Sequence, residues 1–235
     1  MLSPQKKRHL QYLYHGGGLP AICAWFVRAL LSPLYRREAR YVLARKVPER
    51  STLDSAGGGE EKVEAECIVV ESPEALRAVE QEIPSALTYS VESLRNYLAR
   101  GCVVFLIFCP EGTSHERAFV GYGIYQLDVL SLLGQEKSMP LNILCTIYHE
   151  MLPAYRGQRY SNLMRATRDE YCRKQGVKFL CGTVAPENRP SVKAVLTQGG
   201  YQIIGTVVRV SLLKGRFIWE TPWEKIEAAL RDFFR

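Results

Sequence analysis

The pattern of hydrophobic and polar positions predicts a regular series of strands and helices from residue 63 to the end of the chain. Residues 63–70 (VEAECIVV) alternate and are rich in Val, which is typical of a strand. Apolar or alternating runs predict further strands at residues 102–110, 118–129, 141–151, 178–184 and 201–213. The first two of these are joined by a hairpin.

Helices are predicted between these strands, at residues 72–83, 91–99, 161–176, 190–200 and 223–234. Ser72 is a suitable N-cap for the first, and Pro73 falls at the first helical position, where its missing N–H costs nothing. Residues 161–176 carry an apolar stripe and end in Gly, as an amphipathic helix does. The alternation indicates a mixed α/β or α+β domain with helices on both faces of a sheet.

The N-terminal fifth of the chain differs from the rest. Residues 20–47 predict a helical segment broken near Pro33, and residues 51–62 (STLDSAGGGEEK) predict a linker. We therefore expect a helical extension over residues 1–50, a linker over 51–62 and one domain over 63–235.

The net charge of +7 belongs to that extension, because residues 1–50 carry +8 and the remainder carries −1. A nucleic-acid-binding domain more often spreads basic charge over its core, so nucleic acid is not the expected partner. Apolar residues interleaved with arginines between residues 25 and 40 suit a peripheral helix on an anionic membrane. Packing on the chain's own domain, or on a second copy in a homodimer, is the alternative.

Cysteine and histidine positions bear on the compartment and on metals. The seven cysteines are scattered and form no C-x-x-C pair, which favours buried thiols in a reducing, cytoplasmic setting. The four histidines show no metal-ligand spacing, so no metal is expected. The apolar run at residues 19–31 contains an Arg and is shorter than the ~20 residues that a membrane span needs.

The segment with the most chemical information is residues 151–184, which predicts a strand, a sharp turn and a helix. The turn contains Pro153 and Gly157 and places several backbone N–H groups at a helix N-terminus, where partial positive charge attracts phosphate. Arg156 adds a planar guanidinium suited to phosphate oxygens. No G-x-G-x-x-G and no P-loop occurs, which disfavours a dinucleotide or NTP domain.

Two motifs in register resemble those of GNAT superfamily acyltransferases. Residues 151–158 (MLPAYRGQ) are similar to the V-x-P-x-Y-R-G-x segment of that family, and residues 187–194 (ENRPSVKA) to its E-N-x-P-S-x-x-A segment. The one helix and one strand between them match the family's spacing, and Gly200-Tyr201 resembles its Gly-aromatic pair.

The resemblance implies a GNAT-like, mixed and mostly antiparallel twisted sheet flanked by helices, with acyl-CoA wedged where the sheet splays after residues 141–151. It implies no metal. Acetyl-CoA or another acyl-CoA would be the co-substrate, with its pantetheine beside the backbone near Glu150. The cofactor-binding residues that it implies are Met151, Leu152, Arg156, Gly157, Gln158, Arg159, Tyr160, Ser161 and Asn188.

This chain departs from the family pattern in two places. The family loop is usually R-G-x-G-x-G or R-G-x-G-x-A, whereas Arg159 and Ser161 stand at the second and third of these small positions. Arg159 either pairs with a CoA phosphate or closes the site. Many members also place a Tyr late in the helix after the Asn as a general acid. It is missing here, and Tyr201 is the nearest substitute.

These features predict an N-acyltransferase in which a primary amine attacks the thioester directly. Glu150, at the end of the central strand, is the expected general base. His149 is a second candidate, but adjacent residues of a strand face opposite sides, so only one of the two faces the acceptor. The acceptor, a small-molecule or peptide amine, is left open. The altered loop favours one alternative, a non-catalytic acyl-CoA- or lipid-responsive interaction module.

Overall fold

The computed structural model describes residues 35–49, 64–85, 87–110, 117–133, 135–139, 141–212 and 217–235. They belong to two compact units. The larger comprises residues 40–206 and 223–235, and the smaller comprises residues 1–39 and 207–222. All of the predicted site residues belong to the larger unit.

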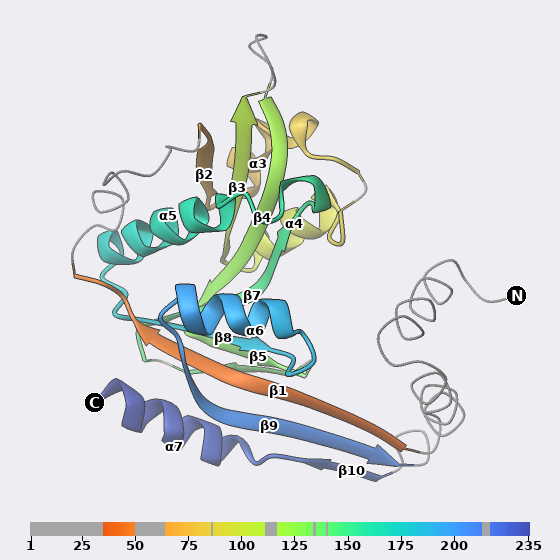
Figure 1. The fold of residues 1–235 in the computed structure, drawn as a ribbon, viewed down its shortest axis with the longest axis vertical. Helices are drawn as coiled ribbons and strands as arrows, with labels where there is room; N and C mark the ends of the chain where they lie inside the picture. Colours follow the sequence, from red (N-terminus) through yellow and green to blue (C-terminus); the bar gives the residue numbers. More distant parts are fainter. Residues whose placement is uncertain are drawn as a thin grey trace, which may run out of the picture. The chain divides into compact units, whose positions relative to one another are not determined.

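The larger unit is built on a sheet in which six strands follow one another in the order β1-β8-β7-β4-β3-β2 (Figure 1). The pairs are antiparallel except for β7 and β8, which run parallel. The predicted mixed, mostly antiparallel sheet is therefore confirmed. The strands are β1 (Tyr35–Lys46), of which residues 40–46 belong to this unit, β2 (Glu66–Val70), β3 (Cys102–Pro110), β4 (Arg117–Leu127), β7 (Ile143–Met151) and β8 (Phe179–Val184).

Helices cover both faces of this sheet (Figure 1). On one face α5 (Tyr160–Lys174) and α6 (Arg189–Lys193) pack on a core that includes Phe105, Tyr125 and Leu180. On the other face α3 (Pro73–Arg77) and α4 (Val91–Ala99) pack on Leu106, Tyr122 and Ile124. Neighbouring residues of β3 alternate between the two cores, which explains why this strand is hydrophobic throughout.

The first strand corrects the sequence analysis. Residues 35–46, predicted as part of a helix, form β1, and its residues 41–46 pair with β8. Residues 42–45 are all buried, with Leu43 and Arg45 toward α5 and Val42 and Ala44 toward the opposite face. A strand buried on both faces lacks the alternation that identifies strands. The remaining residues of the predicted extension, and the linker at 51–62, lie outside the described residues.

Elsewhere the predicted elements are mostly present, with shifted ends. Ser72 caps α3 by accepting a hydrogen bond from the Ala75 N–H (3.2 Å), as predicted. The predicted helix at 72–83 is two short pieces, α3 and the 3₁₀ turn η1 (Glu80–Glu82). Residues 190–200 form α6 followed by a π-helical turn, η3 (Ala194–Gln198).

Two short strands of the larger unit were not predicted, β5 (Val129–Leu132) and β6 (Gln135–Ser138), which pair with each other. The C-terminal helix, α7 (Trp223–Phe234), was predicted. Its two ends are attached to the same unit: the Trp223 indole donates to Gln135 (3.0 Å), and the ring of Phe234 stacks on Phe179.

The smaller unit contains a hairpin. Residues 209–212 of β9 (Gln202–Leu212) pair antiparallel with β10 (Phe217–Glu220), a strand that the sequence analysis did not predict. An ion pair joins Arg209 and Glu220 across the hairpin, and the Val208 N–H donates to the Thr221 hydroxyl (2.9 Å).

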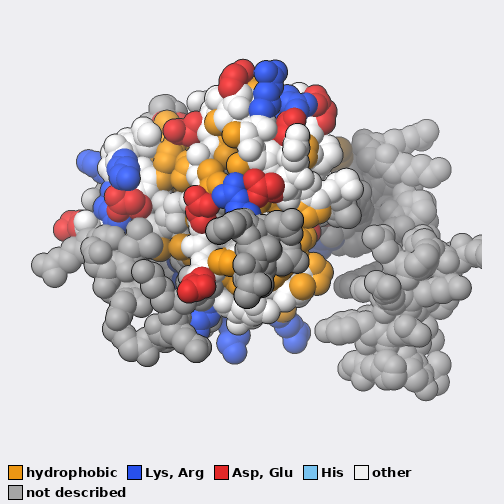
Figure 2. All heavy atoms as spheres, turned by 90° about the horizontal axis from the view of Figure 1, so that it is seen from above, with side chains coloured by type: hydrophobic (Ala, Val, Ile, Leu, Met, Phe, Trp, Pro, Cys, Tyr) orange, Lys and Arg blue, Asp and Glu red, His pale blue; other side chains and the backbone are white. Residues whose placement is uncertain are grey.

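The surface of the described residues mixes charges. On the face shown in Figure 2, basic and acidic side chains stand beside one another. Such neighbours form ion pairs, for example between Arg117 and Glu82 and between Arg95 and Glu80. Among the described helices, none has the length and apolar composition needed to cross a membrane.

Candidate active site

The two central strands, β7 and β8, separate at the end where the predicted site lies. β7 and β8 pair through residues 143–145 and 179–181, and within the described residues no pairing follows, although β7 continues to Met151 and β8 to Val184. The other edge of β7 stays paired with β4 up to Met151. The sheet therefore opens after Cys145, within the strand after which the resemblance implied a splay.

The open edge of β7 carries backbone hydrogen-bonding groups. The Leu152 N–H donates to the Val120 carbonyl of β4 (2.9 Å). Because successive residues of a strand direct their N–H groups to opposite edges, the Met151 N–H faces the edge that β8 has left. The same edge receives Arg156, whose Nε donates to the Met151 carbonyl oxygen (3.0 Å).

The turn between β7 and α5 depends on two residues with positive φ. Gly157 has φ +81° and Arg159 has φ +65°, and the space where a Gly157 side chain would lie is open. Arg159 stands at the N-cap of α5, and its carbonyl accepts from the Asn162 N–H (2.8 Å). The backbone at 159 thus keeps the left-handed conformation that a glycine adopts readily, although the residue is an arginine.

This strain gives a stability prediction. Because glycine relieves the left-handed strain and alanine does not, Arg159→Gly is expected to exceed Arg159→Ala in free energy of unfolding by about 1 kcal/mol. Both variants remove the same guanidinium, so their difference isolates the backbone. Urea denaturation of the two variants measures it, and an alanine variant as stable as the glycine variant would contradict the conformation assigned to Arg159.

The start of α5 is rich in hydrogen-bond donors and positive charge. Within the described residues the backbone N–H groups of Gly157, Gln158, Tyr160 and Ser161 have no acceptor. The first turn of α5 holds no acidic residue, although the positive end of a helix normally favours one. Arginines stand instead at 156, 159 and 165. This combination favours an anion at the turn.

Other side chains near the turn make contacts within the protein. The Gln158 side-chain amide donates to the Ala154 carbonyl (2.9 Å). Tyr160 packs edge-on against Tyr155, with ring centroids 5.8 Å apart. Ser161 is half-buried. Asn188 caps α6 by accepting a hydrogen bond from the Ser191 N–H (3.3 Å), while its predicted contact with CoA stays a prediction.

Glu150 lies on the α3 and α4 face of β7. Its Oε2 accepts hydrogen bonds from the hydroxyls of Tyr122 (3.1 Å) and Tyr148 (3.3 Å). Glu150 is half-buried, and its Oε1 has no partner among the described residues. The structure therefore holds the carboxylate from one side and leaves the other oxygen for a ligand.

His149 lies on the opposite face of β7, toward α5, as the strand alternation predicted. Desolvation lowers its pKa to about 4, and the nearby charges of Arg168 and Arg165 act in the same direction. The His149 side chain is nevertheless exposed to solvent. A neutral imidazole in positive surroundings holds a proton poorly, which makes Glu150 the better candidate base.

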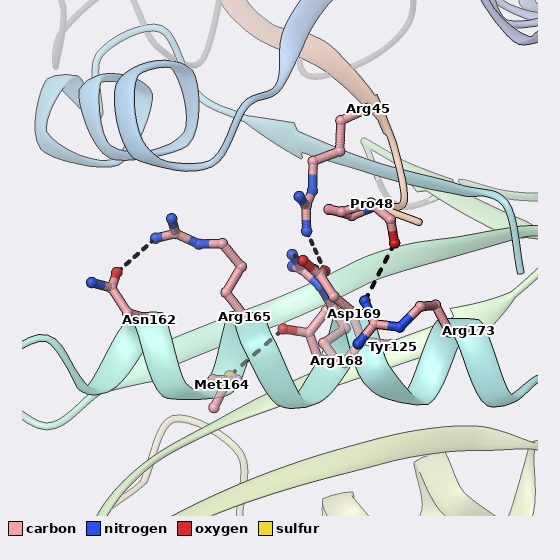
Figure 3. Close-up of polar contacts among 9 residues, drawn as sticks. All are labelled: Arg45, Pro48, Tyr125, Asn162, Met164, Arg165, Arg168, Asp169 and Arg173. Carbon is pink, nitrogen blue, oxygen red and sulfur yellow. Dashed lines mark hydrogen bonds and ion pairs between the residues drawn. The ribbon is translucent and has the colours of Figure 1, made fainter. Parts of the chain in front are cut away.

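Tyr201, the proposed substitute acid, is buried in the α5 face of the sheet. The guanidinium groups of Arg45 and Arg168 lie over its ring, with their Cζ atoms 5.3 and 5.9 Å from the ring centroid. Both arginines form ion pairs with the same Oδ1 of Asp169 (Figure 3). Tyr201 thus belongs to a buried polar cluster, and its role as an acid stays a prediction.

Sequence reasoning missed the tyrosines around Glu150 and the Arg45–Asp169–Arg168 cluster. Tyr122 and Tyr148 are typical strand residues that individually give no functional signal. A signal for the cluster was present in Arg168-Asp169, two charged residues in the apolar half of a helix pattern. Their partner Arg45 lies 124 positions away from Asp169, which no local pattern reveals.

Comparison with known proteins adds little to this geometry. No family model matches the chain, and no curated protein resembles it significantly. A Drosophila structural-genomics target is 12% identical with a TM-score of 0.45, over 84% of this chain and 59% of its own. A conserved protein of unknown function from Staphylococcus epidermidis is 8% identical with a TM-score of 0.46, over 78% and 65%. This chain thus spans less than two thirds of either.

A third structure is that of AAC(6')-Iy in complex with the bisubstrate analogue CoA-S-monomethyl-acetylneamine. It is 14% identical with a TM-score of 0.38, over 57% of this chain and 89% of its own. At these scores the likenesses carry no conclusion about the chemistry of this chain. Among the described residues no cluster of His, Cys, Asp or Glu could hold a metal ion.

Proposed function

We propose that this chain is an acyl-CoA-dependent N-acyltransferase, acetyl transfer to a primary amine being the simplest case. The observation that carries the proposal is the combination, at one end of β7, of an unpaired strand edge and a cationic helix start. Glu150 stands at the same strand end. A donor with an anionic phosphate part and an amide-containing arm fits both features.

Coenzyme A would supply the acyl group as an activated thioester. The free amides of Gly157, Gln158, Tyr160 and Ser161, together with Arg156, would hold its pyrophosphate. The open edge of β7 would pair with the amide-containing arm, as an added strand does. The Met151 N–H, which faces that edge, would donate a hydrogen bond to the thioester carbonyl oxygen and stabilise developing negative charge.

The transfer itself balances with Glu150 as base. The acceptor ammonium first loses one proton, and its neutral nitrogen then attacks the carbonyl carbon. The C–N bond forms, the C–S bond breaks, and the departing thiolate takes up a proton. The second proton of the nitrogen passes to Glu150, which returns it to solvent, and the thiolate takes its proton from solvent, so one proton is released overall for each amide formed.

The first test is calorimetric titration of acetyl-CoA into the wild type and Arg156→Glu. We expect wild-type affinity in the micromolar range and at least tenfold weaker binding by the variant, since the reversed charge repels phosphate. Lys225→Glu makes the same charge change at an exposed site on α7, and its affinity should equal that of the wild type.

Two outcomes separate the alternatives. If the wild type bound neither acetyl-CoA nor longer acyl-CoAs in the calorimetric titration, the acyltransferase proposal would be wrong. Binding that is never followed by turnover, over a broad panel of amines, would instead support a non-catalytic module that responds to acyl-CoA.

A further inference from the structure

Four tyrosines form a connected cluster on the α3 and α4 face of the sheet, and two of them, Tyr122 and Tyr148, contact Glu150. Tyr122 comes from β4, Tyr148 from β7, Tyr97 from α4 and Tyr89 from the segment before α4. Ring centroids are 5.7 Å apart for Tyr122 and Tyr148, 4.8 Å for Tyr89 and Tyr148, and 5.5 Å for Tyr89 and Tyr97. Segments far apart in sequence thus build one aromatic cluster about a carboxylate.

The members of this tyrosine cluster have different access to a ligand. Tyr122 is fully buried, whereas Tyr89, Tyr97 and Tyr148 are half-buried, as is Glu150. A ligand that reaches the carboxylate would therefore touch the rings of Tyr148 and Tyr89. Tyr122 supports Glu150 from beneath and acts as a positioning residue.

Hydrogen bonds determine which carboxylate oxygen of Glu150 is available to a ligand. The Tyr122 oxygen accepts from the Tyr89 backbone N–H (3.1 Å), so its own proton points to Glu150 Oε2. Desolvation raises the pKa values of Tyr122 and Tyr148, and the charge of Glu150 raises them further, which keeps both hydroxyls protonated. With Oε2 occupied, Oε1 is the acceptor available to an incoming N–H group.

The charges near the cluster favour a cation. Among the described residues, the formal charge that shifts the pKa values of Tyr122 and Tyr148 is the negative charge of Glu150. The guanidinium of Arg100 lies at the far side, 5.8 Å from the Tyr97 ring. Aromatic faces attract ammonium groups, and the carboxylate adds its full charge. Within the part of the chain that the structure describes, Glu150 forms no ion pair, so a carboxylate on the ligand would add like charge beside it.

We propose that the acceptor is a cationic primary amine whose carrier is uncharged and has a flat apolar surface, seated on Tyr148 and Tyr89 with its nitrogen at Glu150 Oε1. This inference rests on the proposed function and specifies its acceptor. Amino acids, which place a carboxylate next to the amine, are excluded by the same arrangement of charges.

A matched pair of probes tests the proposal. 2-Phenylethylamine and phenylalanine share the ring and the amine and differ by one carboxylate. With acetyl-CoA as donor, we expect kcat/KM to be at least tenfold higher for 2-phenylethylamine. Tyr148→Leu should raise the KM for this amine about tenfold, because the ring face is lost. Tyr171→Phe, which removes another tyrosine–carboxylate hydrogen bond (to Glu71, 2.9 Å), should change neither value.

Binding without transfer separates this proposal from the proposed function. Calorimetric titration of 2-phenylethylamine into the protein with bound CoA should show binding that Glu150→Gln weakens, and 2-phenylethanol, which lacks the charge, should not bind. Equal or better use of phenylalanine would overturn the acceptor inference and leave the acyltransferase intact. Amine binding with this selectivity but no transfer would overturn the transferase and retain the inference. Failure of 2-phenylethylamine to bind would overturn the inference.

Discussion

Replacement of Asp169 by asparagine is expected to lower the free energy of unfolding by about 3–5 kcal/mol, the usual cost of removing one partner from a buried ion pair. Asp169 is 1% exposed, and its Oδ1 is shared by Arg45 and Arg168, which are 8% and 7% exposed. Asparagine keeps an acceptor of the same shape but not the charge. Urea denaturation followed by circular dichroism measures the loss.

A paired variant makes this prediction specific to charge. The cluster buries two guanidinium groups for one carboxylate, and the Nε atoms of Arg45 and Arg168 have no hydrogen-bond partner. Desolvation lowers the pKa of the neighbouring Arg165, and the charges of Arg168 and Arg45 lower it further. Arg45→Met removes the surplus charge and one unpaired donor, so its cost should be smaller than that of Asp169→Asn by about 2 kcal/mol or more. Equal losses would mean that packing, not charge, dominates the cluster.

The sequence was sufficient to predict the part of the site that follows from local pattern. β7 and α5 were predicted within two residues of their observed bounds, because a strand, a Pro–Gly turn and an amphipathic helix each have a strong signature. The turn contains Gly157 at positive φ, as its place in a sharp turn allows, whereas the positive φ of Arg159 was not predicted.

The conformation of β1 could not be predicted from local sequence pattern. Its sequence, YRREARYVLARK, is rich in residues that favour helices, and its residues 42–45 are all buried. Pairing with β8, about 140 residues later, decides its conformation. The same pairing carries Arg45 into the interior, where only Asp169 on α5 makes an arginine tolerable. Tertiary contacts therefore override a local preference here.

The residues around Glu150 could not be predicted because they depend on the pairing register of β4 with β7, which the sequence of a single strand does not specify. A bulge between β4 and β7 at Ile124 and Tyr125 shifts the pairing, and the following pairs set Tyr122 opposite Glu150. Each tyrosine by itself would be predicted as core. The close approach of the two strands also requires Gly121, where an added Cβ would lie 2.4 Å from the Glu150 carbonyl oxygen.

Glu150→Gln is expected to lower kcat by about 10²-fold or more while the affinity for acetyl-CoA stays within twofold of wild type. Glutamine retains an oxygen that accepts from the Tyr122 and Tyr148 hydroxyls, so the local structure should persist. What is lost is the ability to take a proton from the amine at Oε1. Single-turnover measurement of amide formation at saturating acetyl-CoA isolates this step from binding.

The matched control is Glu71→Gln, which alters another carboxylate that accepts a tyrosine hydroxyl (Tyr171, 2.9 Å) but lies away from the end of β7. Its kcat should equal that of the wild type. His149→Gln should also retain most activity, because the imidazole is neutral and faces α5. If His149→Gln abolished turnover and Glu150→Gln did not, the base would lie on the α5 face, and the tyrosine cluster would then have no part in the transfer.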